Sequence, residues 1–256
     1  MVYLPTYSEA LSKTSGIIPE FINPKYKDET KTTFKKPTRL ECMMQDLPKL
    51  LDSKSRVGFT EFERWMCFSA VKNSIQGGAE KQKKTGFSES ASSGEADIYR
   101  YYRRALNEIG VRVQVDSGMT KEWTPGIQTP VDCAMIVIQP CETACNMTSM
   151  GNRFKTPRNV SITNRSTLIL RGDVVIEKLD LDGALIVDAE PGVRVRIKKM
   201  TVKNAGIEPV QIDSNDKNLP ESIRIRGYDM KRKYVTHAIY HKEDPDDKKI
   251  DEVVIE

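Results

Sequence analysis

The sequence of 256 residues contains no long run of apolar side chains, and only two of its residues are histidine. A membrane-spanning helix needs about 20 consecutive, mostly apolar residues, so we expect no membrane partner. The N-terminal stretch MVYLPTYSEA lacks the basic and then apolar segments of a secretory signal. The five cysteines include no Cys-x-x-Cys pair. These absences predict a cytoplasmic protein with reduced thiols.

A strong excess of one charge sign is also missing, since 40 Lys and Arg residues face 36 Asp and Glu residues, for a net charge of +4. Such a near balance argues against strong attraction to nucleic acid. Tyrosines and arginines are mixed at 99–104 (YRYYRR), and such side chains can stack on bases. The mixture is also typical of an amphipathic helix with a solvated basic face, which we favour. We therefore expect no nucleic-acid partner.

Familiar catalytic and metal-binding motifs are absent as well. The sequence has no Gly-x-Gly-x-x-Gly loop, no Walker motif, no His-Glu-x-x-His and no serine nucleophile elbow. Cys133, Cys141 and Cys145 lie in one stretch, and His237 and His241 are four residues apart. This spacing lacks the tight pairs of a structural zinc site, so we predict no metal site.

The first part of the chain predicts short elements separated by polar segments. Residues 8–15 indicate the end of a helix that Gly16 closes, and residues 17–22 indicate a short strand. The polar stretch 23–38 contains two prolines and predicts a surface loop.

A helix is expected over 38–47, because Thr38 and Glu41 have the spacing of a capping box and apolar residues follow at helical intervals. The apolar residues of 57–62 suggest a buried edge. The stretch 76–94 is rich in Gly, Ser and Lys and predicts a flexible loop.

Ser92 and Glu95 form a second capping box, which predicts a helix that ends at Gly110. The face of this helix is marked by Ile98, Tyr102, Leu106 and Ile109.

From about residue 117 on, the pattern changes to short β segments. The run 133–138 (CAMIVI) predicts a buried strand, and apolar residues then recur about every six positions between turns. The recurring residues are Ile162, Leu168, Val174, Leu179 and Leu185. One inward side chain per face and repeat is what a β-helix shows, and an ordinary β-sandwich is the alternative. Residues 221–228 (ESIRIRGY) predict one more strand, and the charged tail 242–256 is expected to fray.

Two lysines are candidates for binding an anion. Lys72 ends the apolar run 65–72, where burial of its stem would aim the ammonium at a fixed point. Lys25 follows Asn23 and Pro24, and the proline ring stiffens the approach to it. A held ammonium suits phosphate oxygens, since two unit charges about 4 Å apart attract by about 4 kcal/mol at an effective dielectric of about 20. The alternative is that both lysines are solvated surface residues.

Several blocks of the sequence resemble UDP-sugar pyrophosphorylases, the broad-specificity relatives of UDP-glucose pyrophosphorylase. The longest block is EFINPKYKDETKTTFKKPTRLECMMQD at 20–46. The others, in the family's order, are FSAVKN (68–73), SSGEADIYR (92–100), RSTLILRG (165–172), LDLDGALIVDAE (179–190) and ESIRIRGY (221–228). Together they match less than half of a family member, its C-terminal part.

The resemblance implies an α/β remnant of a Rossmann-like nucleotidyltransferase domain over 1–116, followed by an all-β left-handed β-helix domain over 117–256 with its charged tail. Residues 123–158 depart from the family, which usually shows Trp-Pro-x-Ile and an amphipathic helix there. This chain has Trp123-Thr124-Pro125-Gly126 instead, so the resemblance gives no structure for that region.

The resemblance implies a uridylyltransferase that converts UTP and a monosaccharide 1-phosphate into UDP-sugar and pyrophosphate, reversibly and with Mg²⁺. Its partners would be these small molecules, and the chain would be a monomer. Lys72 matches the lysine that contacts the nucleotide-sugar phosphates, as the catalytic residue. Lys25 and Asn23 match a loop that borders the sugar-phosphate site, as substrate-binding residues.

The family's Gly-rich nucleotide loop, its uracil contacts and the aspartates that hold Mg²⁺ lie upstream of the matched blocks. We therefore expect this chain to be a part that lacks them and is inactive by itself. Because the sugar pocket is also mostly upstream, the sequence does not indicate which sugar phosphates are accepted. The alternative function is a non-catalytic β-helix module that serves assembly or regulation.

Overall fold

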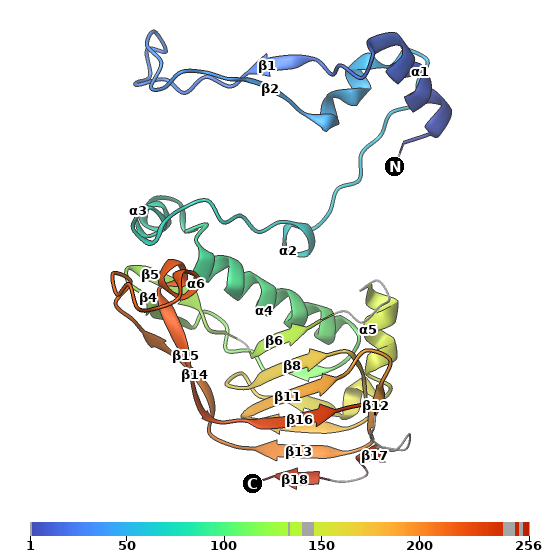
Figure 1. The fold of residues 1–256 in the computed structure, drawn as a ribbon, viewed down its shortest axis with the longest axis vertical. Helices are drawn as coiled ribbons and strands as arrows, with labels where there is room; N and C mark the ends of the chain where they lie inside the picture. Colours follow the sequence, from blue (N-terminus) through green and yellow to red (C-terminus); the bar gives the residue numbers. More distant parts are fainter. Residues whose placement is uncertain (1, 133, 140–145, 243–248, 251–252, 256) are drawn as a thin grey trace. The chain divides into compact units, whose positions relative to one another are not determined.

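The computed structural model describes residues 2–132, 134–139, 146–242, 249–250 and 253–255. It divides into two units, Met1–Glu61 and Phe62–Glu256, each of which is described by itself (Figure 1). The domain boundary between residues 116 and 117 stays a prediction. No helix in the described part of the chain has both the length and the apolar character of a membrane span.

The first unit consists of one α-helix, one 3₁₀ helix and a two-stranded arm (Figure 1). The predicted first helix is confirmed as α1 (Leu4–Thr14). β1 (Glu20–Ile22) pairs antiparallel with β2 (Leu40–Cys42), and the predicted loop connects them. Farther out on the arm, Tyr26 and Phe34 form an isolated antiparallel bridge, with their rings 5.4 Å apart.

The prediction of a helix over 38–47 is wrong. Residues 40–42 are strand β2, with Leu40 opposite Ile22, and a 3₁₀ helix, η1 (Met44–Leu50), follows. The apolar residues at helical intervals form no buried stripe, because Leu40 and Met44 are exposed. The backbone of β2 is satisfied by a partner strand about twenty residues away in the sequence, which a local capping pattern cannot indicate.

The first unit buries few side chains. Among its described residues, only Ala10 and Asp46 are buried. The predicted buried edge at 57–62 is wrong, since Phe59 is 94% exposed. Other exposed apolar residues are Tyr3, Leu4, Ile17, Ile22, Phe34, Leu40, Met44 and Val57.

The main part of the second unit is a coil of three parallel sheets. Successive strands of the coil belong to the first, second and third sheet in turn (Figure 1). The first sheet has the order β18-β13-β10-β7-β3, the second β16-β11-β8-β6 and the third β17-β12-β9. The central strands are β7 Val160–Ile162, β8 Thr167–Arg171, β9 Asp173–Ile176, β10 Leu179–Asp182, β11 Ala184–Ala189, β12 Arg194–Ile197 and β13 Met200–Lys203. The outer strands are β3 Arg112–Val113, β6 Met135–Ile138, β16 Thr236–Tyr240, β17 Lys249–Ile250 and β18 Val253–Ile255.

Apolar side chains in register fill the inside of the coil. Leu179 lies opposite Val160 on one side and Met200 on the other, and Leu185 lies opposite Leu168. All five are buried. The predicted rhythm of apolar residues is therefore confirmed as a set of core positions, and so is the buried strand within 133–138, which is β6. The five residues of the rhythm lie on the successive strands β7 to β11, so the repeat of about six residues places one core side chain on each sheet in turn.

The turns of the coil are packed closely against one another. Gly172 has a φ of +81°, and a Cβ atom there would lie 2.2 Å from the carbonyl oxygen of Ala189. Asn204 closes another turn: its Oδ1 accepts from the backbone N–H of Ala184 at 2.7 Å, and its Nδ2 donates to the carbonyl of the same residue at 2.9 Å. These turns therefore tolerate little extra volume.

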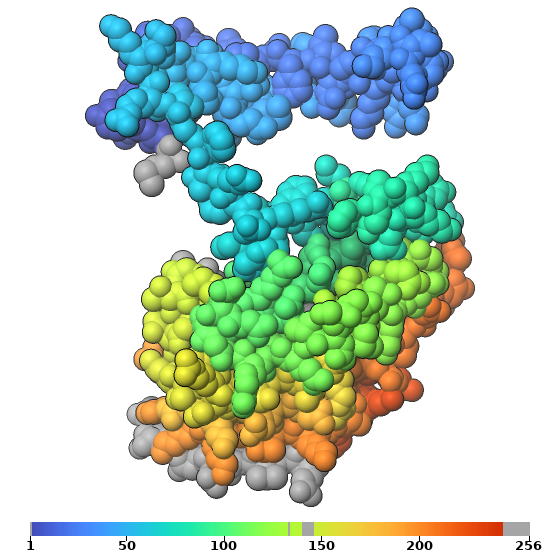
Figure 2. Space-filling view, turned by 180° about the vertical axis from the view of Figure 1, so that it is seen from behind, coloured from blue at the N-terminus to red at the C-terminus, as the bar shows by residue number. Residues whose placement is uncertain are grey.

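Three helices come first in the sequence of the second unit: α2 (Arg64–Cys67), α3 (Ile75–Thr85) and α4 (Ala91–Glu108). α4 lies along β6 and β3 and covers one end of the coil, as Figures 1 and 2 show. Leu106 of α4 is buried in the core of the coil. The hydroxyl of Tyr102 donates to the carbonyl of Ile138 at 2.6 Å.

The prediction of a flexible loop over 76–94 is wrong, because this stretch contains α3 and the first turn of α4. α4 begins two residues before the predicted capping box, since Ser90 accepts from the N–H of Ser93 and forms the box with it. Its end near Gly110 is confirmed. α3 packs closely at Gly78, where a Cβ atom would lie 3.2 Å from the Cβ of Ser90. Of the glycines that suggested a loop, Gly78 and Gly94 thus serve close packing.

An excursion leaves the coil between β13 and β16 (Figure 1). It contains β14 (Gly206–Gln211) and β15 (Tyr228–Tyr234), which pair antiparallel, with α6 (Glu221–Arg226) between them. The predicted strand over 221–228 is therefore wrong. Gly227, at a φ of +88°, ends this short helix, and Ile225 is 54% exposed.

The remaining elements lie between strands of the coil in the sequence, two of them between β3 and β6 and two between β6 and β7. They are the antiparallel hairpin of β4 (Thr120–Thr124) and β5 (Ile127–Pro130), helix α5 (Met147–Arg153) and the 3₁₀ helix η2 (Pro157–Asn159). Within the tail 242–256, the described residues 249–250 and 253–255 continue the sheets of the coil, which contradicts the expected fraying there. Residues 243–248, 251–252 and 256 lie outside the described residues.

Candidate functional site

Lys72 lies on the segment 68–74 between α2 and α3, which has no regular secondary structure. This segment is attached to α4 by individual contacts. Ser69 Oγ donates to Asp97 Oδ2 at 2.8 Å. Val71 packs on Gly94, where a Cβ atom would come within 2.7 Å of it. The segment therefore has a fixed course along the start of α4.

The backbone of Lys72 is held, while its side chain is exposed. The N–H groups of Lys72 and Asn73 both donate to the carbonyl oxygen of Glu89, at 2.8 and 3.1 Å. The expected burial of the lysine stem is wrong, because the run 65–72 is mostly exposed, with Val71 at 58%. Main-chain hydrogen bonds, and not an apolar sleeve, thus fix the point from which the ammonium extends.

Three cations surround the Glu89 carboxylate. Lys81 Nζ lies 2.5 Å from Glu89 Oε2. The hydrogen bond from Lys81 lowers the pKa of the Glu89 carboxyl, and the charges of Lys81, Lys72 and Arg64 act in the same direction, while desolvation opposes them. Lys72 therefore belongs to a group of three cations that act on the Glu89 carboxylate.

A hollow of about 720 Å³ adjoins this segment, and Ala70 and Glu89 contribute to its wall. Its walls combine aromatic and basic side chains. Arg104 stacks over the ring of Trp65 at 5.3 Å, and Arg64 stacks over Phe87 at 5.1 Å. Further lining residues include Phe68, Arg100 and Tyr101. Flat rings beside cations suit a ligand with an aromatic part and an anionic part.

Asn23 and Lys25 directly follow β1 in the first unit, and both are exposed. The carbonyl of Lys25 accepts from the N–H of Lys35 at 2.7 Å, which ties the two sides of the arm together. Because Lys72 belongs to the second unit, the structure does not test whether the three residues share one site. That grouping stays a prediction.

The predicted absence of a zinc site concerned three cysteines and two histidines. Cys133, Cys141 and Cys145 lie outside the described residues. His237 Nε2 lies 2.5 Å from Asp188 Oδ2, and His241 lies 3.8 Å from Glu190. In the described part of the chain, no three His, Cys, Asp or Glu side chains stand together as a metal site would require.

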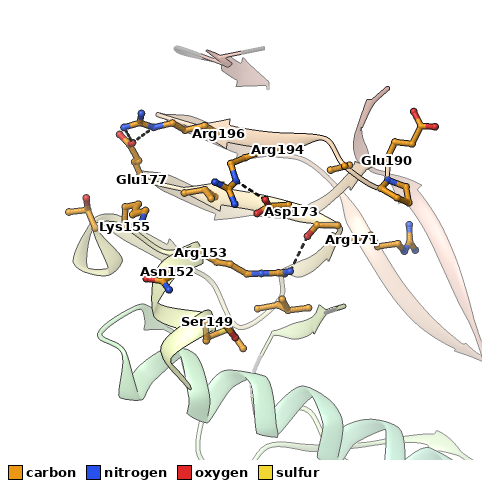
Figure 3. A pocket seen from close by; sticks show the side chains of 18 residues that line it. Ser149, Asn152, Arg153, Lys155, Arg171, Asp173, Glu177, Glu190, Arg194 and Arg196 are labelled. Atoms are coloured by element: carbon orange, nitrogen blue, oxygen red, sulfur yellow. Dashed lines mark hydrogen bonds and ion pairs between the residues drawn. The ribbon is translucent and has the colours of Figure 1, made fainter. Parts of the chain in front are cut away.

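A larger groove, of about 1310 Å³, runs along the third sheet beside α5 (Figure 3). Arginines line it, but they pair with acidic side chains: Arg194 Nε lies 2.6 Å from Asp173, and Arg196 pairs with Glu177. Arg153 is buried and donates to the carbonyls of Gln139 and Gly172. The charges of Arg194 and Arg196 are thus compensated by carboxylates, whereas the hydrogen bonds of Arg153 go to neutral carbonyls.

The sequence analysis did not identify Glu89 and Lys81 as residues of the site. Glu89 lies in a stretch that read as a flexible loop, and Lys81 lies on a helix that this loop prediction excluded. The matched block SSGEADIYR contains Gly94, which has no side chain and so leaves room for Val71. This glycine was the sequence signal for close packing of the segment 68–74 on α4.

No family model matches the chain. A UDP-sugar pyrophosphorylase from Arabidopsis thaliana is 40% identical to it over 226 residues, which cover 88% of this chain and 35% of that protein. Proteins of the same name from Oryza sativa subsp. indica and subsp. japonica are each 36% identical over 228 residues, which cover 87% of this chain and 35% of theirs. The chain thus spans about a third of the length of the curated relatives it matches. Over that third it is similar to proteins named UDP-sugar pyrophosphorylase, as the sequence blocks indicate.

Proposed function

We propose that this chain is part of a uridylyltransferase that converts UTP and a monosaccharide 1-phosphate into UDP-sugar and pyrophosphate, reversibly. The identity of 40% to a UDP-sugar pyrophosphorylase carries the proposal. The held backbone of Lys72, beside a hollow lined by rings and cations, supports it. The substrates would be UTP and sugar 1-phosphates.

In this reaction an oxygen of the sugar 1-phosphate attacks the α-phosphorus of UTP in line, and pyrophosphate leaves. A protein contributes to such a step mainly by positioning the substrates and by supplying positive charge. Lys72 is proposed to neutralise phosphate oxygens as charge moves to the leaving group. Asn23 and Lys25 are proposed to contact the sugar phosphate. One such electrostatic contact is typically worth about 3–4 kcal/mol of the barrier, or roughly 10²–10³ in rate.

We propose that the reaction uses Mg²⁺, as the family resemblance implies. The described residues of this chain contain no group of three His, Cys, Asp or Glu side chains that could hold a metal, and Mg²⁺ at phosphate sites is usually bound by only one or two carboxylates together with the substrate phosphates. We propose that those carboxylates lie in family regions outside this sequence, and no step here passes through the ion.

We also propose the finer features of the fold. The coil would be a left-handed β-helix domain over 117–256, and residues 1–116 would complete a Rossmann-like nucleotidyltransferase domain. Short parallel strands that enter three sheets in turn support the first statement. The protein would be cytoplasmic and a monomer. Sedimentation of the purified chain tests whether it is a monomer.

The test of the function is an assay with UTP and glucose 1-phosphate. It would compare this chain alone with this chain joined to the part of the Arabidopsis thaliana relative that it does not match. We expect turnover by the joined protein only. In it, Lys72→Ala should lower kcat by roughly 10²–10³, and Lys72→Arg should restore little, because a planar fork replaces a point charge.

Lys84→Ala is the matched control, because Lys84 is an exposed lysine on the neighbouring helix α3. An unchanged kcat in Lys72→Ala would remove Lys72 from the mechanism. A joined protein that folds but produces no UDP-sugar would instead favour the non-catalytic β-helix module.

A further inference from the structure

Glu89 has an unusual backbone conformation. Its φ is +48°, a left-handed region that residues other than glycine rarely adopt. Such a conformation is strained, and it persists only where surrounding contacts hold it. In this conformation the carbonyl oxygen of Glu89 meets the N–H groups of both Lys72 and Asn73.

The side chain of Glu89 supplies a contact that holds this conformation. Its carboxylate pairs with Lys81 Nζ at 2.5 Å, with side-chain exposures of 21% for Glu89 and 35% for Lys81. Lys81 belongs to α3, and that helix is packed closely against Ser90 at Gly78. The ion pair therefore connects Glu89 to a fixed helix.

The neighbouring residue adds a second connection to the same segment. Asn73 Nδ2 donates to the carbonyl of Ser88 at 2.8 Å. Ser88 is 1% exposed, and its hydroxyl hydrogen-bonds with that of Ser90 at 3.0 Å. Lys72 and Asn73 are thus tied to consecutive carbonyls of 88–89, which a buried serine pair keeps in place.

We propose that Glu89, held by Lys81, is a positioning residue that sets the direction in which the side chain of Lys72 extends from the segment 68–74. This inference rests on the proposed function, because it assumes that Lys72 meets phosphate. Glu89 itself touches no substrate in this proposal. Its carbonyl orients the peptide of Lys72, and its ion pair with Lys81 holds that carbonyl in a left-handed conformation.

Hydrogen exchange of the two amides tests the positioning without any substrate. In Lys81→Met, the amides of Lys72 and Asn73 should exchange about five to ten times faster, because the ion pair to Glu89 and the hold on its left-handed conformation are lost. Lys81→Arg keeps the charge and should restore most of the protection. Lys84→Met removes a lysine from the same helix without this contact and should leave both rates unchanged.

A second pair of variants separates the backbone from the carboxylate. Glu89→Gly removes the carboxylate but favours positive φ, so the two amides should stay protected, and adding Lys81→Met should have no further effect. Glu89→Ala removes the carboxylate and keeps the strain, so protection should fall as in Lys81→Met. Equal protection in Glu89→Ala and in the unaltered chain would overturn the proposal.

Inorganic pyrophosphate serves as the phosphate probe, with the amide signal of Lys72 followed by NMR on the full chain. We expect its apparent affinity to fall about three- to tenfold in Lys81→Met, to recover in Lys81→Arg, and to stay unchanged in Lys84→Met. An equal affinity in Lys81→Met and in the unaltered chain would overturn the positioning role.

The two levels of inference fail separately. If pyrophosphate leaves the Lys72 signal of the unaltered chain unmoved, the role of Lys72 in the proposed function is contradicted. The exchange rates still decide whether Glu89 and Lys81 hold the segment. If the exchange rates in Lys81→Met match those of the unaltered chain, the inference about Glu89 is wrong while the function stands.

Discussion

The coil of the second unit and the arm of the first unit are both built from paired strands, yet they bury very different amounts of side chain. Every apolar residue of the predicted rhythm in the coil is buried, while Leu40 and Ile22, which face each other in the arm, are 66% and 58% exposed. An isolated two-stranded ribbon is marginally stable in water, because backbone pairing alone offsets little conformational entropy. The comparison predicts that the coil supplies most of the free energy of unfolding.

The largest effect should come from truncating a core residue of the coil. Leu185→Ala should lower the free energy of unfolding by about 2–5 kcal/mol, because it removes buried methyl groups and leaves a cavity. Leu40→Ala in the arm should change it by less than about 0.5 kcal/mol, since Leu40 is already exposed. Urea unfolding followed by circular dichroism measures both. Similar losses in the two variants would break the comparison.

The next effect concerns the turns of the coil. Gly172 and Gly86 share a φ of +81°, but a Cβ atom at Gly172 would overlap the carbonyl of Ala189, while one at Gly86 would meet nothing within 4 Å. Gly86→Ala should therefore cost only the backbone strain, about 1 kcal/mol, and Gly172→Ala about 2–4 kcal/mol. Thermal unfolding of both variants gives the difference, and equal midpoints would show that the turns of the coil can relax.

A smaller effect should appear at alkaline pH, where the excursion meets α4. Burial raises the pKa of the Tyr228 phenol above its ordinary value of 10, and the charge of Glu95 acts in the same direction. A raised pKa means that the stabilising contribution is complete below about pH 10 and is lost as the pH rises further.

The free energy of unfolding should therefore fall above pH 10, by up to about 1.4 kcal/mol per pH unit for this tyrosine. Tyr228→Phe should flatten that fall, and Tyr234→Phe, at an exposed position, should leave it as it is. Urea unfolding at pH 9, 10 and 11 measures the slope, and parallel slopes in all three proteins would contradict the prediction.

The smallest effect is expected on the outer face of the third sheet. The side chain of Arg194 is 77% exposed where it pairs with Asp173, so Arg194→Met should cost less than about 1 kcal/mol, and the cost should disappear in 1 M salt. A salt-independent loss of several kcal/mol in the free energy of unfolding would mean that the outer ion pairs, and not the inner apolar side chains, stabilise the coil.

The coil could be predicted because its pattern repeats and is local. Ile162, Leu168 and Val174 are buried because each occupies the core position of its strand, so each repeat supports the same interpretation. Residues 38–47 and 221–228 could not be predicted in this way. Their secondary structure depends on partners elsewhere in the chain, such as Ile22 opposite Leu40, and on a single turn residue, Gly227.

The candidate site was predictable only in part. A lysine at the end of an apolar run singled out Lys72, and the family blocks added Lys25 and Asn23. The contact that holds Lys72 comes from a main-chain carbonyl of Glu89. A carbonyl is present in every residue, so no letter of the sequence marks its role. The left-handed conformation at Glu89 is equally hidden, because it occurs at a residue that has a Cβ atom.

The excursion through β14, α6 and β15 bears on how readily this fold accepts inserted sequence. The ladder from β10 to β13 joins residues 179 and 200, whereas the ladder from β11 to β16 joins residues 185 and 236. Closing a loop about two and a half times as long adds only about 0.8 kcal/mol of chain entropy, since the cost grows with the logarithm of length. Extra length in this segment therefore adds little entropic cost, provided that the strands on either side keep their register and that Tyr228 stays buried.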